Sequence, residues 1–304
     1  MSAGGPLSLP ASPVAAAFRN IQWDPLSSLR LTAQETALLR MAETNPIEYT
    51  LADSRDASMY ARVLLKLLAE ASAAGSGTGT VSTLKQACSQ TKAQELLETD
   101  PLGVVTHYAL AKLHDIITTL NSGSGVSVST VFYVGKEGVL VDQWKALLRI
   151  LNKGGKGDVY AQTSAALCLA QILVTSCPSL QTGAEKDPMG KGRPTSYASA
   201  VEPLEALTAW VVTQLKGASG TSVGICIPAL TALMGAAETR LLFVSNGGVK
   251  YLCRQLRVGG KRSGSEQPLP TGASASVQQL YELSFCLWTL TYELSNSYNV
   301  RSEF

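Results

Sequence analysis

Charged residues of either sign are scarce in this 304-residue chain, which contains 25 Lys and Arg and 23 Asp and Glu. Charged residues make up only 16% of the sequence, and the formal net charge is +2. A nucleic-acid-binding domain needs a concentrated basic surface, which this balance does not provide. We therefore expect no nucleic-acid partner.

Long apolar runs are missing as well, since none approaches the roughly 20 residues that a transmembrane helix needs. The opening segment, MSAGGPLSLPASPVAAAF, has neither the basic beginning nor the strong apolar stretch of a secretory signal. We expect a cytosolic protein that does not insert directly into a membrane.

Histidine is limited to His107 and His114, seven residues apart. No Cys or carboxylate accompanies them at metal-ligand spacing, and no HExxH motif occurs. The chain has six cysteines, and no two of them form a CxxC pair, which favours buried reduced thiols. The cysteines are Cys88, Cys168, Cys177, Cys226, Cys253 and Cys286. We predict no catalytic residue and no metal ligand.

Nucleotide-binding motifs are also lacking, although Gly-Lys pairs occur. A Walker loop requires Ser or Thr directly after the Lys, together with a preceding strand. None of the pairs meets the first condition; they lie at Gly135-Lys136, Gly155-Lys156, Gly190-Lys191 and Gly260-Lys261. We expect no cofactor and no nucleotide hydrolysis, so an enzyme is the least favoured class.

Apolar residues at helical spacing are abundant, most clearly in Glu238–Leu294. In Val277–Leu294 the large residues stand three and four positions apart, which keeps them on one face of a helix. Asn246-Gly247-Gly248 permits a positive φ that ends the preceding helix in a sharp turn. We predict a unit of two short helices, a loop from about Arg257 to Ser276 and one long helix.

A second copy of this unit occurs earlier in the chain. Lys145–Leu151 shares Lys, Leu, Arg and Leu in register with Lys250–Leu256, and a loop and a Cys-Leu-containing helix follow each. One such unit cannot bury both faces of its last helix, so repeated units stack. The sequence predicts an all-α solenoid of helical repeats.

The amino-terminal end differs in composition. Residues 1–19 are rich in Pro, Ala, Gly and Ser, and we expect a disordered tail there, followed by one solenoid over residues 20–304. Thr32 and Glu35 have the three-residue spacing of a capping box at the start of a helix.

Large apolar residues at helical spacing are usually core anchors. We assign Trp23, Leu252, Phe285, Leu287 and Trp288 to the structural core. On this assignment, Leu287→Ala or Trp288→Ala should destabilise the fold by about 2–5 kcal/mol.

The most basic segment is Arg254–Arg262, and a solvated loop is the favoured interpretation of it. The alternative is a contact for an acidic partner surface, since exposed Lys and Arg on a loop can steer association. The residues predicted to contact a partner are Arg254, Arg257, Lys261 and Arg262.

Four stretches of the sequence carry a resemblance to a known family. FVSNGGVKYLCRQL followed by LSFCLWTLTYE resembles armadillo repeats, and QQLYELSFCLWTLTYE with NIQWDPLSSLRLTAQETALL resembles the amino-terminal domain of the H subunit of the V-type proton ATPase. Thr99-Asp100-Pro101 before ALAKL is similar to a helix entry in the same family. The resemblance implies a right-handed α-solenoid of armadillo/HEAT-like repeats from about Asn20 to Leu294.

The resemblance further implies a non-catalytic regulatory subunit in the soluble sector of the pump. Its partners would be other subunits of the V-ATPase, chiefly the peripheral stalk, on the cytosolic face of vacuolar or other endomembranes. The family's second, carboxy-terminal domain is not expected in this sequence. In that family the second domain bears on silencing the catalytic sector once it has detached, so we do not assign this role to the present chain.

The alternative is an armadillo adaptor of unrelated function that binds peptide or cargo, such as a nuclear-import receptor. Those receptors use a ladder of Trp and Asn on successive inner helices. Ala170 stands where the later copy has Trp288, so the ladder is not repeated and the pump subunit is favoured.

Overall fold

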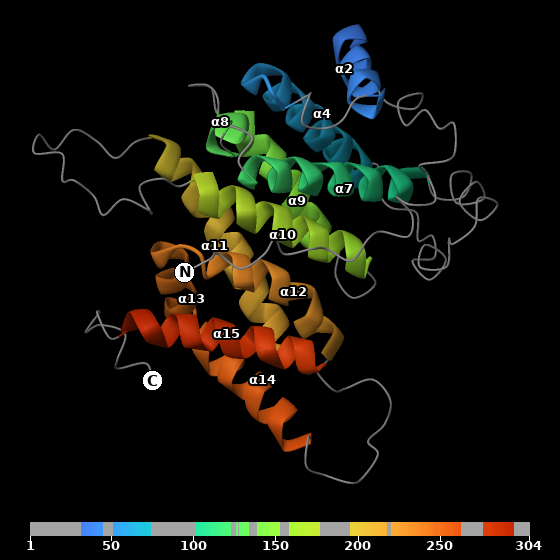
Figure 1. Ribbon diagram of the computed structural model, residues 1–304. Coiled ribbons are helices and arrows are strands. Elements are labelled where there is room, and N and C mark those ends of the chain that lie inside the picture. The colour runs from blue at the N-terminus through green and yellow to red at the C-terminus, as the bar shows by residue number, and fades with distance from the viewer. Residues whose placement is uncertain are drawn as a thin grey trace, which may run out of the picture. The chain divides into compact units, whose positions relative to one another are not determined.

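The computed structural model describes residues 32–44, 51–73, 101–122, 126, 128–133, 139–152, 158–176, 195–217, 220–262 and 276–294. Every element in these ranges is a helix, which confirms the predicted all-α class (Figure 1). The helices are α2 (Ala33–Thr44), α4 (Ser54–Ala73), α7 (Pro101–Asn121), α8 (Val128–Tyr133), α9 (Val139–Asn152), α10 (Val159–Ser176), α11 (Thr195–Lys216), α12 (Gly220–Leu233), α13 (Ala237–Ser245), α14 (Gly248–Arg262) and α15 (Val277–Leu294).

The chain divides into two compact units, Met1–Cys168 and Leu169–Phe304, with the division inside α10. Both copies of the predicted repeat are helical, one as α9 and α10 and the other as α14 and α15. The expected tail at 1–19 and the predicted core residue Trp23 lie outside the described residues. A single solenoid over 20–304 therefore stays a prediction.

In the first unit, α4 is the central helix and packs against α2, α7, α8 and α9. Because neighbours surround it, apolar side chains on more than one face are buried, including Leu64, Leu65, Leu67 and Leu68. Burial of leucines contributes about 1.5–3 kcal/mol for each side chain removed from water, so α4 organises this unit.

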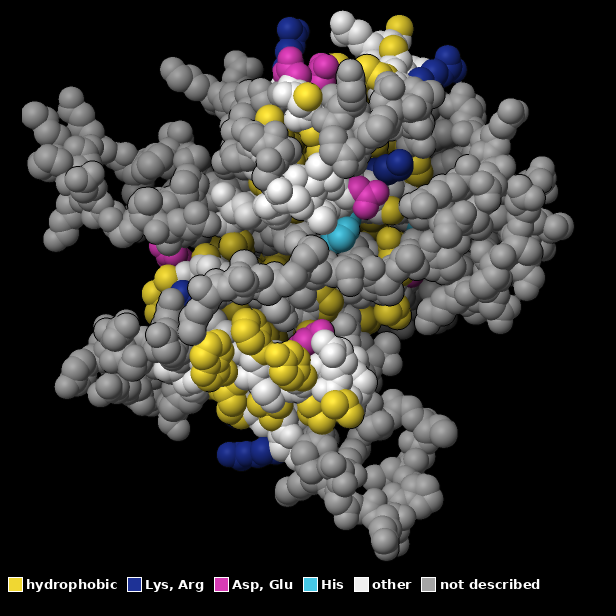
Figure 2. All heavy atoms as spheres, in the orientation of Figure 1, with side chains coloured by type: hydrophobic (Ala, Val, Ile, Leu, Met, Phe, Trp, Pro, Cys, Tyr) yellow, Lys and Arg dark blue, Asp and Glu magenta, His cyan; other side chains and the backbone are white. Residues whose placement is uncertain are grey.

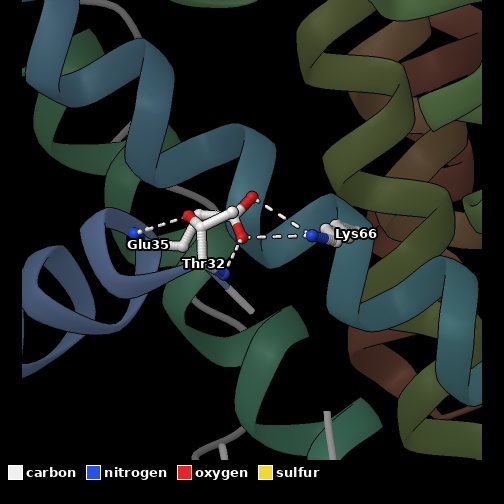
Figure 3. Close-up of polar contacts among 3 residues, drawn as sticks. All are labelled: Thr32, Glu35 and Lys66. Atoms are coloured by element: carbon white, nitrogen blue, oxygen red, sulfur yellow. Dashed lines mark hydrogen bonds and ion pairs between the residues drawn. The ribbon is translucent and has the colours of Figure 1, made fainter. Parts of the chain in front are cut away.

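The predicted capping box starts α2 as expected (Figure 3). The Glu35 carboxylate accepts a hydrogen bond from the Thr32 N–H at 2.7 Å, and the Glu35 N–H donates to Thr32 Oγ1 at 3.2 Å. Lys66 of α4 also reaches this carboxylate, at 3.1 Å. Burial acts to raise the pKa of Glu35, but the hydrogen bonds from Thr32 and Lys66 and the charge of Lys66 outweigh it and lower the pKa.

Glu35→Ala should increase hydrogen exchange of the first-turn amides of α2, because it removes both the capping box and the ion pair with Lys66 of α4. The expected destabilisation is about 1 kcal/mol, with most of it from the cap. Lys66→Ala is the matched control and should have a smaller effect, because the ion pair is partly exposed. Equal protection of α2 in Glu35→Ala and the unmodified chain would refute the role of this cap.

In the second unit, α11 packs against α12, α13 and α14, while α15 packs against α12 and α14. α11 begins at Thr195, so Pro203 lies inside the helix. Its buried stripe includes Leu204, Leu207, Val211 and Leu215.

The Asn246-Gly247-Gly248 turn joins α13 to α14, and its two glycines have different roles. Gly247 has φ = 70°, a conformation that glycine adopts without strain, as predicted for this turn. Gly248 is needed for space, since a Cβ added there would lie 2.4 Å from the ring of Phe243. Phe243 is fully buried, so its ring has little room to move.

Gly248→Ala should destabilise the second unit by about 1–3 kcal/mol through overpacking against Phe243. Gly224→Ala is a suitable control, because the added methyl there meets only the end of the Gln279 side chain, which can rotate away. Urea unfolding of both variants, followed by circular dichroism, checks the prediction. A Gly248→Ala midpoint equal to that of the unmodified chain would contradict the close packing.

Two features of α14 and α15 correct the sequence predictions. α14 continues to Arg262, so the basic segment predicted as a loop from Arg257 is helical. On α15 the buried residues are Leu283, Cys286 and Leu290, which form a different face from the predicted one.

The core assignments must be revised accordingly. Leu252 is fully buried, as predicted, and Leu287 is half-buried. Phe285 and Trp288 are 41% and 59% exposed, so their assignment to the core is wrong. The cause is that α15 carries large apolar residues on two faces, and spacing alone does not tell which face packs inward.

Candidate functional site

The structure places the predicted basic residues on α14. Arg254 and Arg257 are both exposed, and Lys250, which sequence reasoning missed, is exposed one turn earlier. Positions i, i+4 and i+7 share one face of a helix, so these three side chains form a basic stripe. Lys261 and Arg262 end the same helix, but their side chains lie outside the described residues.

α14 is held firmly by its opposite face. Leu252 is fully buried there, and the Gln255 side chain donates hydrogen bonds to the carbonyls of Leu215 at 2.6 Å and Gly217 at 3.0 Å. These bonds supply partners to carbonyl groups at the carboxyl end of α11, where the hydrogen bonds of the helix run out. Since Gly248–Arg262 contains no Asp or Glu, no acid on α14 itself offsets the basic stripe.

α15, which packs against α14, presents an exposed apolar stripe (Figure 2). Its members and their exposed fractions are Val277 85%, Tyr281 69%, Phe285 41% and Trp288 59%. Figure 2 shows hydrophobic side chains gathered over α15, with a basic side chain beside them toward α14. The sequence signal for this stripe is the second apolar face of α15, which helical spacing alone assigns to the core.

The first unit contains a buried polar cluster at the start of α10. His107 Nε2 of α7 donates a hydrogen bond to Asp158 Oδ2, and the His107 ring stacks on Tyr160 with centroids 4.6 Å apart. Asp158 Oδ1 accepts the N–H of Tyr160 at 2.9 Å and of Ala161 at 3.4 Å. This carboxylate therefore caps α10 and joins it to α7.

Burial acts to raise the pKa of Asp158, but its interactions with His107 and with the α10 amides lower it below the ordinary value of 3.8. His107 is only 3% exposed. A buried histidine that already pairs with a helix-capping carboxylate fits a structural role better than a catalytic one.

The described residues contain no group of three or more His, Cys, Asp and Glu that could hold a metal ion. Gly260-Lys261 lies inside α14, where the helical backbone cannot form a phosphate-binding loop. The other three Gly-Lys pairs fall outside the described residues. In the part of the chain described, no helix is long and apolar enough to cross a bilayer.

Cysteines in the described residues behave as small core side chains. Cys168, Cys226 and Cys286 are buried and free, as predicted, and Cys253 is half-buried and free. Burial raises the pKa of all three buried thiols, to about 12 for Cys286. Thiols held in the protonated form are poor nucleophiles, so these residues are not candidates for catalysis.

Comparison with known proteins agrees with the resemblance carried by the sequence motifs. A family model that describes the H subunit of the V-ATPase matches residues 14–300. A protein of Oryza sativa subsp. japonica, named as a probable H subunit of a V-type proton ATPase, is 26% identical over 153 residues, which are 50% of this chain and 30% of that protein. No solved structure matches the chain. Because the family model covers nearly the whole sequence, the chain belongs to the V-ATPase H-subunit family.

Proposed function

We propose that this chain is a non-catalytic regulatory subunit of the soluble sector of a vacuolar-type proton-translocating ATPase. It binds the peripheral stalk, supports ATP-driven proton transport, and works on the cytosolic face of vacuolar or other endomembranes. The observation that carries the proposal is the family match over residues 14–300.

The described residues support a role in binding. His107 is engaged with Asp158, burial raises the pKa of the buried thiols, and Gly260-Lys261 is helical. By contrast, the exposed surface of the second unit offers an apolar stripe and a basic stripe on adjoining helices. Exposed apolar stripes with charged borders are typical of protein interfaces.

One observation supports the alternative of a peptide-binding adaptor, and another opposes it. Exposed Trp288 is what a peptide-binding armadillo helix would present, but Ala170 in the earlier copy is fully buried. The receptors of that class bind basic peptides, which Arg254 and Arg257 on the adjoining helix would repel. The pump subunit remains the favoured function.

The test is ATP-driven proton uptake by vesicles from cells that lack the endogenous gene. Expression of the chain should restore inhibitor-sensitive acidification, and acidification equal to that of the empty vector would contradict the proposal. A double variant, Arg254→Glu with Arg257→Glu, should restore less than Arg62→Glu with Lys216→Glu, which makes the same charge change at other exposed positions.

A further inference from the structure

The exposed apolar stripe on α15 has the dimensions of a helix-binding surface. Val277, Tyr281, Phe285 and Trp288 are spaced by four, four and three residues, so they fall within one narrow band. At 1.5 Å rise per residue the band is about 16 Å long, or roughly three helical turns. Trp and Tyr are the residues most often found at the energetic centres of interfaces.

Two hydroxyl groups beside this band already have hydrogen-bond partners. The Ser284 hydroxyl donates to the Leu280 carbonyl at 2.8 Å, and the Thr291 hydroxyl donates to the Trp288 carbonyl at 2.9 Å. Covering these two hydroxyl groups therefore adds little to the desolvation penalty. The rings of Phe285 and Trp288 lie 6.2 Å apart, which helps to hold both in place before a partner arrives.

The adjoining helix supplies charge of one sign. Lys250, Arg254 and Arg257 form the basic stripe of α14, and α14 packs against α15. Glu282, the acid of α15 whose side chain the structure describes, lies off the apolar band. It is half-buried, and its carboxylate accepts a hydrogen bond from Gln278 at 2.8 Å. An apolar band is thus bordered by positive charge.

We propose that the apolar stripe of α15 and the basic stripe of α14 together bind one amphipathic helix of a partner protein. That helix carries apolar residues at i, i+3, i+4 and i+7, and its flank toward α14 is acidic. The inference rests on the proposed function in taking the chain to be a binding subunit, and it names the partner chemistry.

A helix fits better than the other occupants. A partner helix that lies along α15 can cover the whole apolar band, because packed helices contact one another through stripes of this kind. In a two-fold symmetric dimer through these helices, the basic stripe of one copy would lie near the basic stripe of the other. α14 has no Asp or Glu that could offset this repulsion. An anionic lipid surface would be attracted by the same charge, so a lipid-binding measurement is needed to separate it from a partner helix.

The probe is a labelled helical peptide of about 18 residues, the length of α15, with Leu at the anchor positions and Glu on one flank. Fluorescence anisotropy measures its affinity for the full chain. A peptide in which Lys replaces every Glu should bind at least about tenfold more weakly, and added salt should weaken binding of the Glu peptide.

Variants locate the site. Tyr281→Ala and Trp288→Ala should each weaken binding of the Glu peptide by about tenfold or more. Arg254→Glu with Arg257→Glu should weaken binding and reduce its salt dependence. Leu241→Ala removes a comparably exposed apolar residue of α13 and should leave the affinity unchanged. Circular dichroism verifies that each variant is folded.

Other outcomes overturn the inference. Equal affinity for the Glu and Lys peptides, or equal loss in Leu241→Ala and Trp288→Ala, would contradict it. A dimer in sedimentation that Trp288→Ala dissociates would assign the stripe to a second copy, and a Trp288-dependent response to phosphatidylserine vesicles but not to peptide would assign it to lipid. If peptide binding fails while pump subunits still co-purify with the chain, only this inference fails and the proposed function stands.

Discussion

Phe243→Ala is expected to lower the free energy of unfolding of the second unit by about 3–5 kcal/mol. Phe243 is fully buried on α13, and its ring lies directly against Gly248 at the start of α14. Removing the ring deletes apolar contacts and leaves a cavity beside a turn whose backbone cannot collapse freely. The loss should therefore fall at the high end for a core substitution.

Trp288→Ala is the matched comparison, since it also removes an aromatic ring from the second unit. Because Trp288 is 59% exposed, its replacement should change stability by no more than about 0.5 kcal/mol. Urea unfolding of both variants, with hydrogen exchange of the α11–α15 amides, separates the two cases. A larger loss for Trp288→Ala than for Phe243→Ala would contradict the burial pattern and reinstate Trp288 as a core residue.

Asp158→Ala is expected to destabilise the first unit by about 2–4 kcal/mol, because it removes a helix cap and leaves buried His107 without its carboxylate. Asp158→Asn keeps an oxygen that can accept the amide hydrogen bonds of Tyr160 and Ala161 but lacks the charge. It should therefore retain part of the stability. Similar unfolding midpoints for Asp158→Ala and the unmodified chain would show that the cluster contributes little.

The same cluster predicts a pH dependence of definite sign. The pKa of Asp158 in the folded chain lies below its ordinary value of 3.8. Its carboxylate thus contributes stability that is fully present above that value and is lost as the pH falls through the lowered folded pKa. Acid unfolding of the first unit should show this contribution, and Asp158→Asn should remove it; an unchanged acid profile in Asp158→Asn would contradict the assignment.

Local signals in the sequence predicted much of the fold. Thr32 and Glu35 are three residues apart, so their cap depends only on the first turn of α2. Gly247 likewise has a positive φ at the turn where glycines indicated one.

Contacts between distant residues could not be predicted in the same way. His107 and Asp158 are 51 residues apart, and nothing in the local pattern of either indicates the other. The inward face of α15 is decided by α12 and α14, which cover Leu283, Cys286 and Leu290 and leave Phe285 and Trp288 outside. The basic segment was predicted, but its helical continuation to Arg262 and the inclusion of Lys250 became evident only in the structure.

Affinity purification of the tagged full chain from native endomembranes, with quantitative mass spectrometry, tests the assignment to the proton pump most directly. We predict that stalk and catalytic subunits of the V-ATPase are enriched over an untagged control. Arg254→Glu with Arg257→Glu should reduce this enrichment more than Arg62→Glu with Lys216→Glu. Recovery of transport cargo without pump subunits would contradict the assignment.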